Sequence, residues 1–144
     1  MVNQVRLDSA YLSMAKVWGS LSEANRKKVG CLVVKNNQII SDGFNGTPTG
    51  FDNTCEGEDG ETKPEVLHAE SNAITKLAKS TNSSEGSTLY CTLSPCFQCA
   101  KMIVQSGIKR VVFAEKYSHE EGIEFLGKAG VDIIWMKRAY TGSQ

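Results

Sequence analysis

The sequence has no excess of charge of either sign and no long apolar run. Its 16 basic and 16 acidic residues leave a formal net charge of zero, so no overall electrostatic field attracts nucleic acid or an anionic membrane. No apolar run approaches the roughly 18–20 residues of a membrane-spanning helix, and no secretion signal opens the chain. We therefore expect a cytoplasmic protein without nucleic-acid or membrane partners.

Cysteine is too scarce for a disulfide framework, and its count is odd. With no secretion signal, the five cysteines are better interpreted as thiols or metal ligands than as crosslinks. A chain of 144 residues can bury one core without crosslinks. We expect a single domain over residues 1–137 and a loose tail over 138–144, which has little to bury.

Apolar residues at three- and four-residue steps predict an opening helix. Its predicted apolar face consists of Leu7, Ala10, Tyr11, Met14, Val17, Trp18 and Leu21. Two apolar runs joined by Asn36 and Asn37 then predict an antiparallel hairpin, because asparagine tolerates the positive backbone angles of a tight turn. Residues 45–64 show little periodicity and read as a long loop, a kind that is usually functional or disordered.

The second half of the chain alternates between strand and helix patterns. Helices are expected over about 68–80, after Pro95 and around 123–129, and strands over 87–93, 109–116 and 131–136. This alternation predicts an α/β sheet with helices on both faces. Because a helical segment separates the last two strands, they should be parallel.

Two short motifs place metal-type ligands at predicted helix starts. His68 stands two residues before Glu70 in VLHAESNAI, and Cys96 and Cys99 stand three apart in SPCFQCA. Pro95 favours the first helical position, which predicts both thiols on the first turn, near the positive end of the helix dipole. One imidazole and two thiolates suit tetrahedral zinc with one position left for water.

Glu70 is then placed to take the proton of that water. Two thiolates balance the double charge of zinc, which still lowers the pKa of bound water from 15.7 to about 7. Two residues span roughly 200° on an ideal helix, so His68 and Glu70 converge only if the helix begins there.

Other interpretations of the motifs stay open. A Cys-x-x-Cys pair can be a redox pair or half of a structural zinc site, and a non-catalytic zinc-stabilised binding module would give Glu70 no role and close the site with a fourth protein ligand. Cys31 and Cys91 lie in apolar runs, where small buried residues are the default. Cys55 and His119 are the candidates for extra ligands of a second zinc.

The motifs and their surroundings resemble the zinc-dependent cytidine deaminase superfamily, and within it the deoxycytidylate (dCMP) deaminases. The resemblance rests on GFNGTPTG at 43–50, HAESNAI at 68–74, SPCFQCAKMIVQSGIKRVVF at 94–113 and AGVDI at 129–133. It implies a three-layer α/β/α sandwich with a five-stranded mixed sheet, and hydrolytic deamination of dCMP to dUMP and ammonia. His68, Cys96 and Cys99 would bind Zn2+, and Glu70 would shuttle the proton.

The resemblance also implies how the substrate is held. The Ala69 N–H would bind the pyrimidine O2, the Ser94 carbonyl would receive the amino group and Asn45 would bind the sugar. An enzyme acting on transfer RNA or single strands is the alternative, disfavoured by the zero net charge and by the lack of a second basic run.

A nucleotide phosphate needs a cation, and the run Arg26, Lys27, Lys28 supplies three. Arg26 is preferred because its fork can bind two oxygens at once, although such a run can also be a solvated surface loop. Tyr117, just past a predicted strand, could stack on the base, bind the phosphate or simply pack in the core.

The resemblance further implies a homo-oligomer, often a hexamer, activated by dCTP with Mg2+ and inhibited by dTTP. The effector site would involve Gly43, Phe44, Asn45 and Gly46. The family loop commonly reads Gly-Tyr-Asn-Gly, so Phe44 removes a hydroxyl. If that hydroxyl binds the effector, regulation is weakened or altered.

Overall fold

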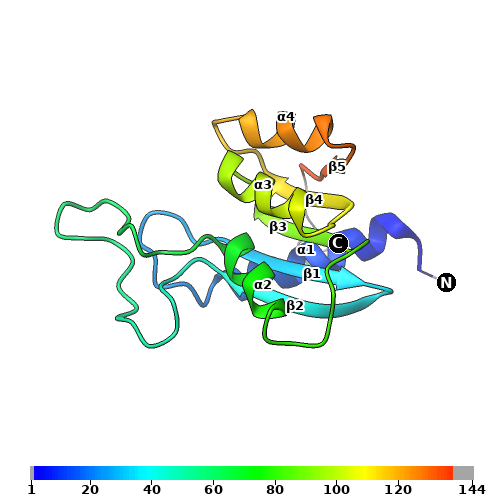
Figure 1. Cartoon of the computed structure of the whole chain (residues 1–144). Helices are drawn as coiled ribbons and strands as arrows, with labels where there is room; N and C mark the ends of the chain where they lie inside the picture. Colours follow the sequence, from blue (N-terminus) through cyan, green and yellow to red (C-terminus); the bar gives the residue numbers. More distant parts are fainter. Residues whose placement is uncertain (1, 138–144) are drawn as a thin grey trace.

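The computed structural model describes residues 2–137, so the predicted tail at 138–144 lies outside the described residues. The helices and strands follow one another in an order that is easily traced in Figure 1. They are α1 (Gln4–Gly19), β1 (Gly30–Lys35), β2 (Gln38–Phe44), α2 (Ala69–Leu77), β3 (Thr88–Leu93), α3 (Phe97–Gln105), β4 (Arg110–Glu115), α4 (Glu121–Lys128) and β5 (Asp132–Trp135).

The strands form one mixed sheet in the order β2-β1-β3-β4-β5. β1 pairs antiparallel with both β2 and β3, whereas β3, β4 and β5 run parallel to one another. The predicted five-stranded mixed sheet and its parallel last two strands are therefore confirmed.

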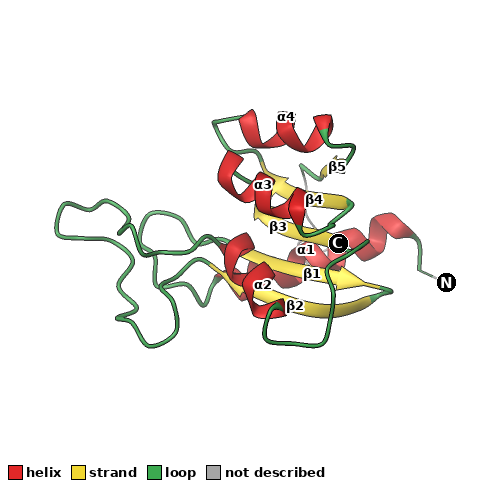
Figure 2. Cartoon of the chain, in the orientation of Figure 1, coloured by secondary structure: helices red, strands yellow, loops and turns green. Residues whose placement is uncertain are grey.

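Helices cover both faces of this sheet, as Figure 2 shows. On one face, alternate strand residues such as Cys31, Cys91 and Phe113 pack with α2, α3 and the inner side of α4. On the other face, Tyr90 and its neighbours pack against α1, the helix that covers this side within residues 2–137. Because successive strand side chains point to opposite faces, each central strand contributes to both cores.

The hairpin prediction is confirmed in detail. Asn36 and Asn37 join β1 to β2 with φ angles of 52° and 60°. Both values lie in the left-handed region that asparagine tolerates, and they match the mirror-image turn that suits the twist of a two-residue hairpin.

The predicted apolar face of α1 is partly wrong. The helix lays Asp8, Leu12, Ala15 and Gly19 on the sheet, while Met14 and Val17 are 46% and 69% exposed. A Cβ added to Gly30 would come 1.9 Å from the Ala15 carbonyl oxygen, so α1 sits almost directly on the β1 backbone. Only very small residues allow a helix to lie this close to a strand, and such residues contribute little to the apolar periodicity from which the face was predicted. Neither α1 nor any other helix within residues 2–137 is both long and apolar enough to cross a membrane.

Candidate active site

The metal-type ligands lie at the first residues of two neighbouring helices. His68 is the N-cap of α2 and Cys96 is the N-cap of α3. The Cys96 Sγ accepts the N–H of Cys99 at 3.5 Å, so a thiol takes the place of the usual capping oxygen. Pro95 precedes the cap and does not open the helix, so that part of the prediction is wrong. The cap still places both sulfurs at the positive end of the helix.

The three side chains fit a zinc ion. The His68 Nδ1 lies 3.4 Å from the Sγ of Cys96 and 3.4 Å from the Sγ of Cys99. Zinc bonds of about 2.0–2.1 Å to nitrogen and about 2.3 Å to sulfur, at a tetrahedral angle, set nitrogen and sulfur about 3.6 Å apart. The ligand atoms all lie within 4.8 Å of one another, so one ion can reach all of them.

Within residues 2–137 no other cluster of histidine, cysteine or acidic ligands meets the same test, and no fourth ligand joins this one. The Cys55 Sγ donates to the Asn53 carbonyl at 3.6 Å, and His119 packs its ring against Tyr117. The candidates for a second zinc are therefore not brought together, and the closed site of a purely structural module is not formed.

The two thiols differ in the direction of their pKa shifts. The side chains of Cys99 and His68 lower the pKa of Cys96 to about 4. The interaction with Cys96, together with burial, raises the pKa of Cys99. The hydrogen bond to Cys96 also raises the pKa of His68. The cluster thus favours a thiolate beside the imidazole, as metal binding requires.

Glu70 lies at the very start of α2, which is the condition for its side chain to converge with that of His68. Since α2 begins at Ala69, Glu70 is its second residue and faces the same cavity as His68. The residue is 4% exposed, and burial raises its pKa, while a backbone hydrogen bond and the nearby His68 oppose that shift. A buried carboxylate of raised pKa is suited to taking up and releasing a proton.

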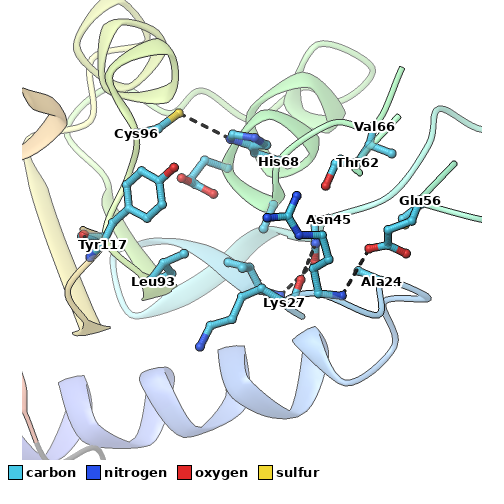
Figure 3. A pocket seen from close by; sticks show the side chains of 16 residues that line it. Ala24, Lys27, Asn45, Glu56, Thr62, Val66, His68, Leu93, Cys96 and Tyr117 are labelled. Carbon is cyan, nitrogen blue, oxygen red and sulfur yellow. Dashed lines mark hydrogen bonds between the residues drawn. The ribbon is translucent and has the colours of Figure 1, made fainter. Parts of the chain in front are cut away.

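These groups open into a cavity of ≈ 330 Å³. Figure 3 shows His68 and Cys96 at one end and Ala24 and Lys27 at the other. The predicted substrate residues all line it, together with residues that sequence reasoning did not single out for this role. The former are Arg26, Asn45, Ala69, Ser94 and Tyr117; the latter are Ala24, Val29, Cys55, Glu56, Thr62, Val66 and Leu93.

The parallel pairing of β3 and β4 brings Ser94 and Tyr117 together. The Ser94 N–H donates to the Glu115 carbonyl at 2.8 Å, and the Tyr117 N–H donates to the Ser94 Oγ at 2.7 Å. Both residues follow the carboxyl ends of their strands, where ligands of α/β sheets commonly bind.

Asn45 lies between this cavity and a second hollow of ≈ 340 Å³. Its Oδ1 accepts the Val29 N–H at 2.9 Å, and its Nδ2 donates to the Lys27 carbonyl at 2.8 Å. Asn45 therefore fixes the backbone around Lys27 in addition to lining the cavity.

The second hollow contains three of the four residues predicted to bind an effector: Phe44, Asn45 and Gly46. Gly43 lies elsewhere, packed on α2, where an added Cβ would come 2.5 Å from the Ala69 carbonyl oxygen. The structure thus gives Gly43 a packing role.

Arg26 is held through both its backbone and its side chain. Its N–H donates to Glu56 at 3.2 Å, and its Nη1 lies 2.7 Å from Glu61. Glu56 is buried, whereas Glu61 is exposed. Nothing in the acidic run from 56 to 61 marks Glu56 as the buried member, so the sequence could not single it out.

Known proteins resemble this chain in sequence and in fold. The family model described as the cytidine and deoxycytidylate deaminase zinc-binding region matches residues 5–115. The chain is 33% identical to the deoxycytidylate deaminase of Saccharomyces cerevisiae, over 88% of this chain and 43% of the yeast protein. It is also 33% identical to the deoxycytidylate deaminase of Enterobacteria phage T4, over 88% of each chain.

A solved structure points to the same family as the relatives found by sequence. The dCMP deaminase of the cyanophage S-TIM5, crystallised in complex with dCMP and dUMP, is 47% identical and superposes with a TM-score of 0.89 over 94% of this chain and 99% of that one. The chain thus spans less than half of the yeast relative but nearly all of the phage proteins. By its family match, its relatives and its fold, this chain belongs to the cytidine and deoxycytidylate deaminase zinc-binding family.

Proposed function

We propose that this protein is a zinc-dependent deaminase that hydrolyses dCMP to dUMP and ammonia. The observation that carries the proposal is one cavity lined both by His68, Cys96 and Glu70 and by the cationic residues Arg26 and Lys27. Such a cavity combines hydrolytic groups with cations that suit a phosphate. The structural match to a phage enzyme crystallised with dCMP and dUMP supports the same substrate class.

Zinc held by His68, Cys96 and Cys99 would supply Lewis-acid chemistry that lowers the pKa of a coordinated water to about 7. Glu70 accepts the proton of the attacking water and delivers it to N3 of the cytosine ring. Glu70 then takes the remaining proton of the hydroxyl group added at C4 and passes it to the amino group. The C4–N4 bond breaks, ammonia leaves, the C4 oxygen becomes the carbonyl of dUMP, and Glu70 is again a carboxylate. General acid–base catalysis of this kind contributes about 10²–10⁴ in rate.

The remaining cavity residues would orient the nucleotide. Ala69 is the first residue of α2, so its N–H has no acceptor within the helix and is free to bind the pyrimidine O2. The Ser94 carbonyl would receive the amino group, Asn45 would contact the sugar, and Tyr117 would stack on the base or bind the phosphate.

Arg26 and Lys27 would bind the phosphate. Each is paired with a carboxylate, Arg26 with Glu61 at 2.7 Å and Lys27 with Glu115 at 2.5 Å, and all four side chains are more than half exposed. Exposed ion pairs are worth only about 0–1 kcal/mol, so a phosphate dianion can replace the carboxylates.

Replacing Glu70 with glutamine tests the proposal. Glu70→Gln keeps the shape of the site but cannot carry the proton, so we expect kcat to fall by about 10²-fold or more while bound zinc is unchanged. Ammonia release from dCMP and zinc content by atomic emission measure the two effects. Glu65→Gln, an exposed residue shortly before α2, is the matched control. Near-normal turnover of Glu70→Gln would reject the proton-shuttle role.

Regulation and assembly remain predictions. The second hollow, lined by Phe44, Asn45 and Gly46, is the place where a triphosphate effector would bind, with dCTP and Mg2+ activating and dTTP inhibiting. Because Asn45 also lines the catalytic cavity, an effector there would act on the substrate site through one shared side chain. A homo-oligomer, a hexamer by family analogy, and a cytoplasmic location stay predictions as well.

A further inference from the structure

Glu56 is a buried carboxylate bonded to the backbone that precedes the basic run. Its side chain is 8% exposed. Both of its oxygens lie 3.1 Å from the N–H of Asn25, and its Oε2 also accepts the N–H of Arg26 at 3.2 Å. Figure 3 shows the Glu56 carboxylate pointing toward the segment that carries Lys27.

No cation of the described residues neutralises this carboxylate. Among residues 2–137, no lysine, arginine or histidine lies within ion-pair distance of Glu56. A buried charge is costly unless it is well hydrogen-bonded, and here two backbone N–H groups supply the hydrogen bonds. Because the N–H groups of Asn25 and Arg26 are already occupied, they are not free for a phosphate, which leaves that role to the side chains.

The loop that carries Glu56 is itself held in place. Glu56 and Thr62 form an antiparallel bridge, the Lys63 N–H donates to the Cys55 carbonyl at 2.8 Å, and the Gly57 N–H donates to the Glu61 carbonyl at 2.9 Å. Cys55 is 1% exposed and anchors the loop in the protein interior. Residues 55–63 therefore form a small hairpin that presents the Glu56 carboxylate in one position.

The opposite end of the basic run is fixed by Asn45, which bonds to the Val29 N–H and the Lys27 carbonyl. The backbone from Asn25 to Val29 is thus tied at both ends, although it belongs to no helix or strand. We propose that Glu56 is a positioning residue for the phosphate site, setting the direction in which Arg26 leaves the backbone. This inference rests on the proposed function.

The isosteric variant Glu56→Gln tests the inference. It places an NH2 donor against backbone N–H donors, so the segment should lose its fixed direction while the zinc end of the cavity stays intact. We expect the KM for dCMP to rise about tenfold, with kcat within about twofold of the wild type and unchanged zinc content. Glu58→Gln, an exposed residue of the same hairpin, is the matched control and should leave both constants unchanged.

A second comparison separates positioning from general destabilisation. If Glu56 acts through Arg26, the double variant Glu56→Gln/Arg26→Ala should have about the same KM as Arg26→Ala alone. The inference would be overturned if the KM increases of the two single variants multiplied fully in the double variant. It would also be overturned if kcat, zinc content and Tm all fell together in Glu56→Gln. If Glu56→Gln does not fold, Glu56→Asp, which keeps the charge but shortens its reach, must show the KM increase.

The activity of the wild type shows whether the proposed function or only the role of Glu56 has failed. A zinc-loaded wild type that releases no ammonia from dCMP rejects the proposed function. An active wild type whose KM is unaffected by Glu56→Gln rejects only the role of Glu56.

Discussion

Asp8 occupies a position on the buried side of α1 where the helix pattern favours an apolar residue. Its carboxylate accepts the Tyr90 hydroxyl at 2.6 Å, Gln4 Nε2 at 2.9 Å and both terminal nitrogens of Arg110 at 2.9 and 2.5 Å. Burial raises the pKa of Asp8, but the hydrogen bonds from Arg110, Tyr90 and Gln4 outweigh it and lower the pKa below its ordinary value. This network joins α1 to β3 and β4 at the face away from the active site.

Asp8→Asn should make the protein less stable at neutral pH and less sensitive to acid. Removing one partner of a buried ion pair costs about 3–5 kcal/mol. Because the folded-state pKa of Asp8 is lowered, its contribution is complete above the ordinary value of 3.8 and is lost as pH falls through the folded-state pKa. Urea unfolding at pH 7 and at steps down to about pH 3 would measure both effects.

The exposed α4 variant Glu124→Gln is the control for this experiment, and its free energy of unfolding should stay within about 0.5 kcal/mol of the wild type. If the free energy of unfolding fell with pH equally in the wild type and in Asp8→Asn, the lowered pKa of Asp8 would be contradicted.

At the same scale, the proposed zinc ligands and Glu70 were easier to identify from the sequence than the supporting residues. His68, Glu70, Cys96 and Cys99 were identifiable because metal ligands need particular atom types at particular spacings. Glu56 was not, because its role depends on which acidic side chain of a long loop turns inward, and that choice is made by tertiary contacts.

At the scale of elements, the start of α4 packs against the backbone around Cys96, although α4 contributes no ligand to the proposed zinc site. A Cβ added to Gly122, in its first turn, would come 2.2 Å from the Pro95 carbonyl oxygen and 2.9 Å from that of Cys96. The start of α4 is therefore pressed against the backbone that carries the first zinc-type thiol. A Cβ added to Gly127, just over one turn later, would meet the Ile133 Cδ1 at 4.0 Å and no closer atom of the described residues outside its own helix.

Gly122→Ala should therefore weaken zinc binding, whereas Gly127→Ala should not. The extra methyl at 122 has to displace α4 or the Cys96 backbone, at a cost of about 1–3 kcal/mol, and support lost around a metal site typically costs about 10–100-fold in affinity. The same change at 127 should be neutral or stabilise the helix by up to about 1 kcal/mol. Competition with a chromogenic zinc chelator would measure both, and equal zinc affinities in the two variants would refute the packing role.

The sequence pattern predicted which helices and strands form, but not how α1 is oriented on the sheet. Periodicity predicted the existence of every helix and strand, and Asn36 and Asn37 predicted the hairpin. It did not predict how α1 is rotated about its axis. Ala15 and Gly19 face the sheet because they are small enough for close packing, and Asp8 faces it because it pairs with Arg110. An apolar periodicity does not detect either cause.

Across the whole molecule, a zinc ion would tie α2 to α3 over the same face of the sheet. Any ligand that binds only the folded state stabilises it, by about 4 kcal/mol at 1,000 times its Kd. At about 2–4 °C per kcal/mol for a chain of this size class, chelation should lower Tm by roughly 10 °C and abolish turnover. Calorimetry with and without chelator, followed by zinc addition, would check this, and recovery of Tm is expected. The Tm of a His68→Ala variant should respond much less, and an equal response would contradict the assigned ligands.

The proposed ligands and Glu70 all fall within the continuous α2-β3-α3 stretch from 68 to 99, while Arg26, Asn45, Glu56 and Tyr117 come from outside it. Related proteins can therefore diverge in how they hold the sugar and the phosphate by changing these outer segments, while the stretch from 68 to 99, which also carries Ala69 and Ser94, stays the same. Selection for a new substrate would act first on the turn after α1 and on the long loop before α2.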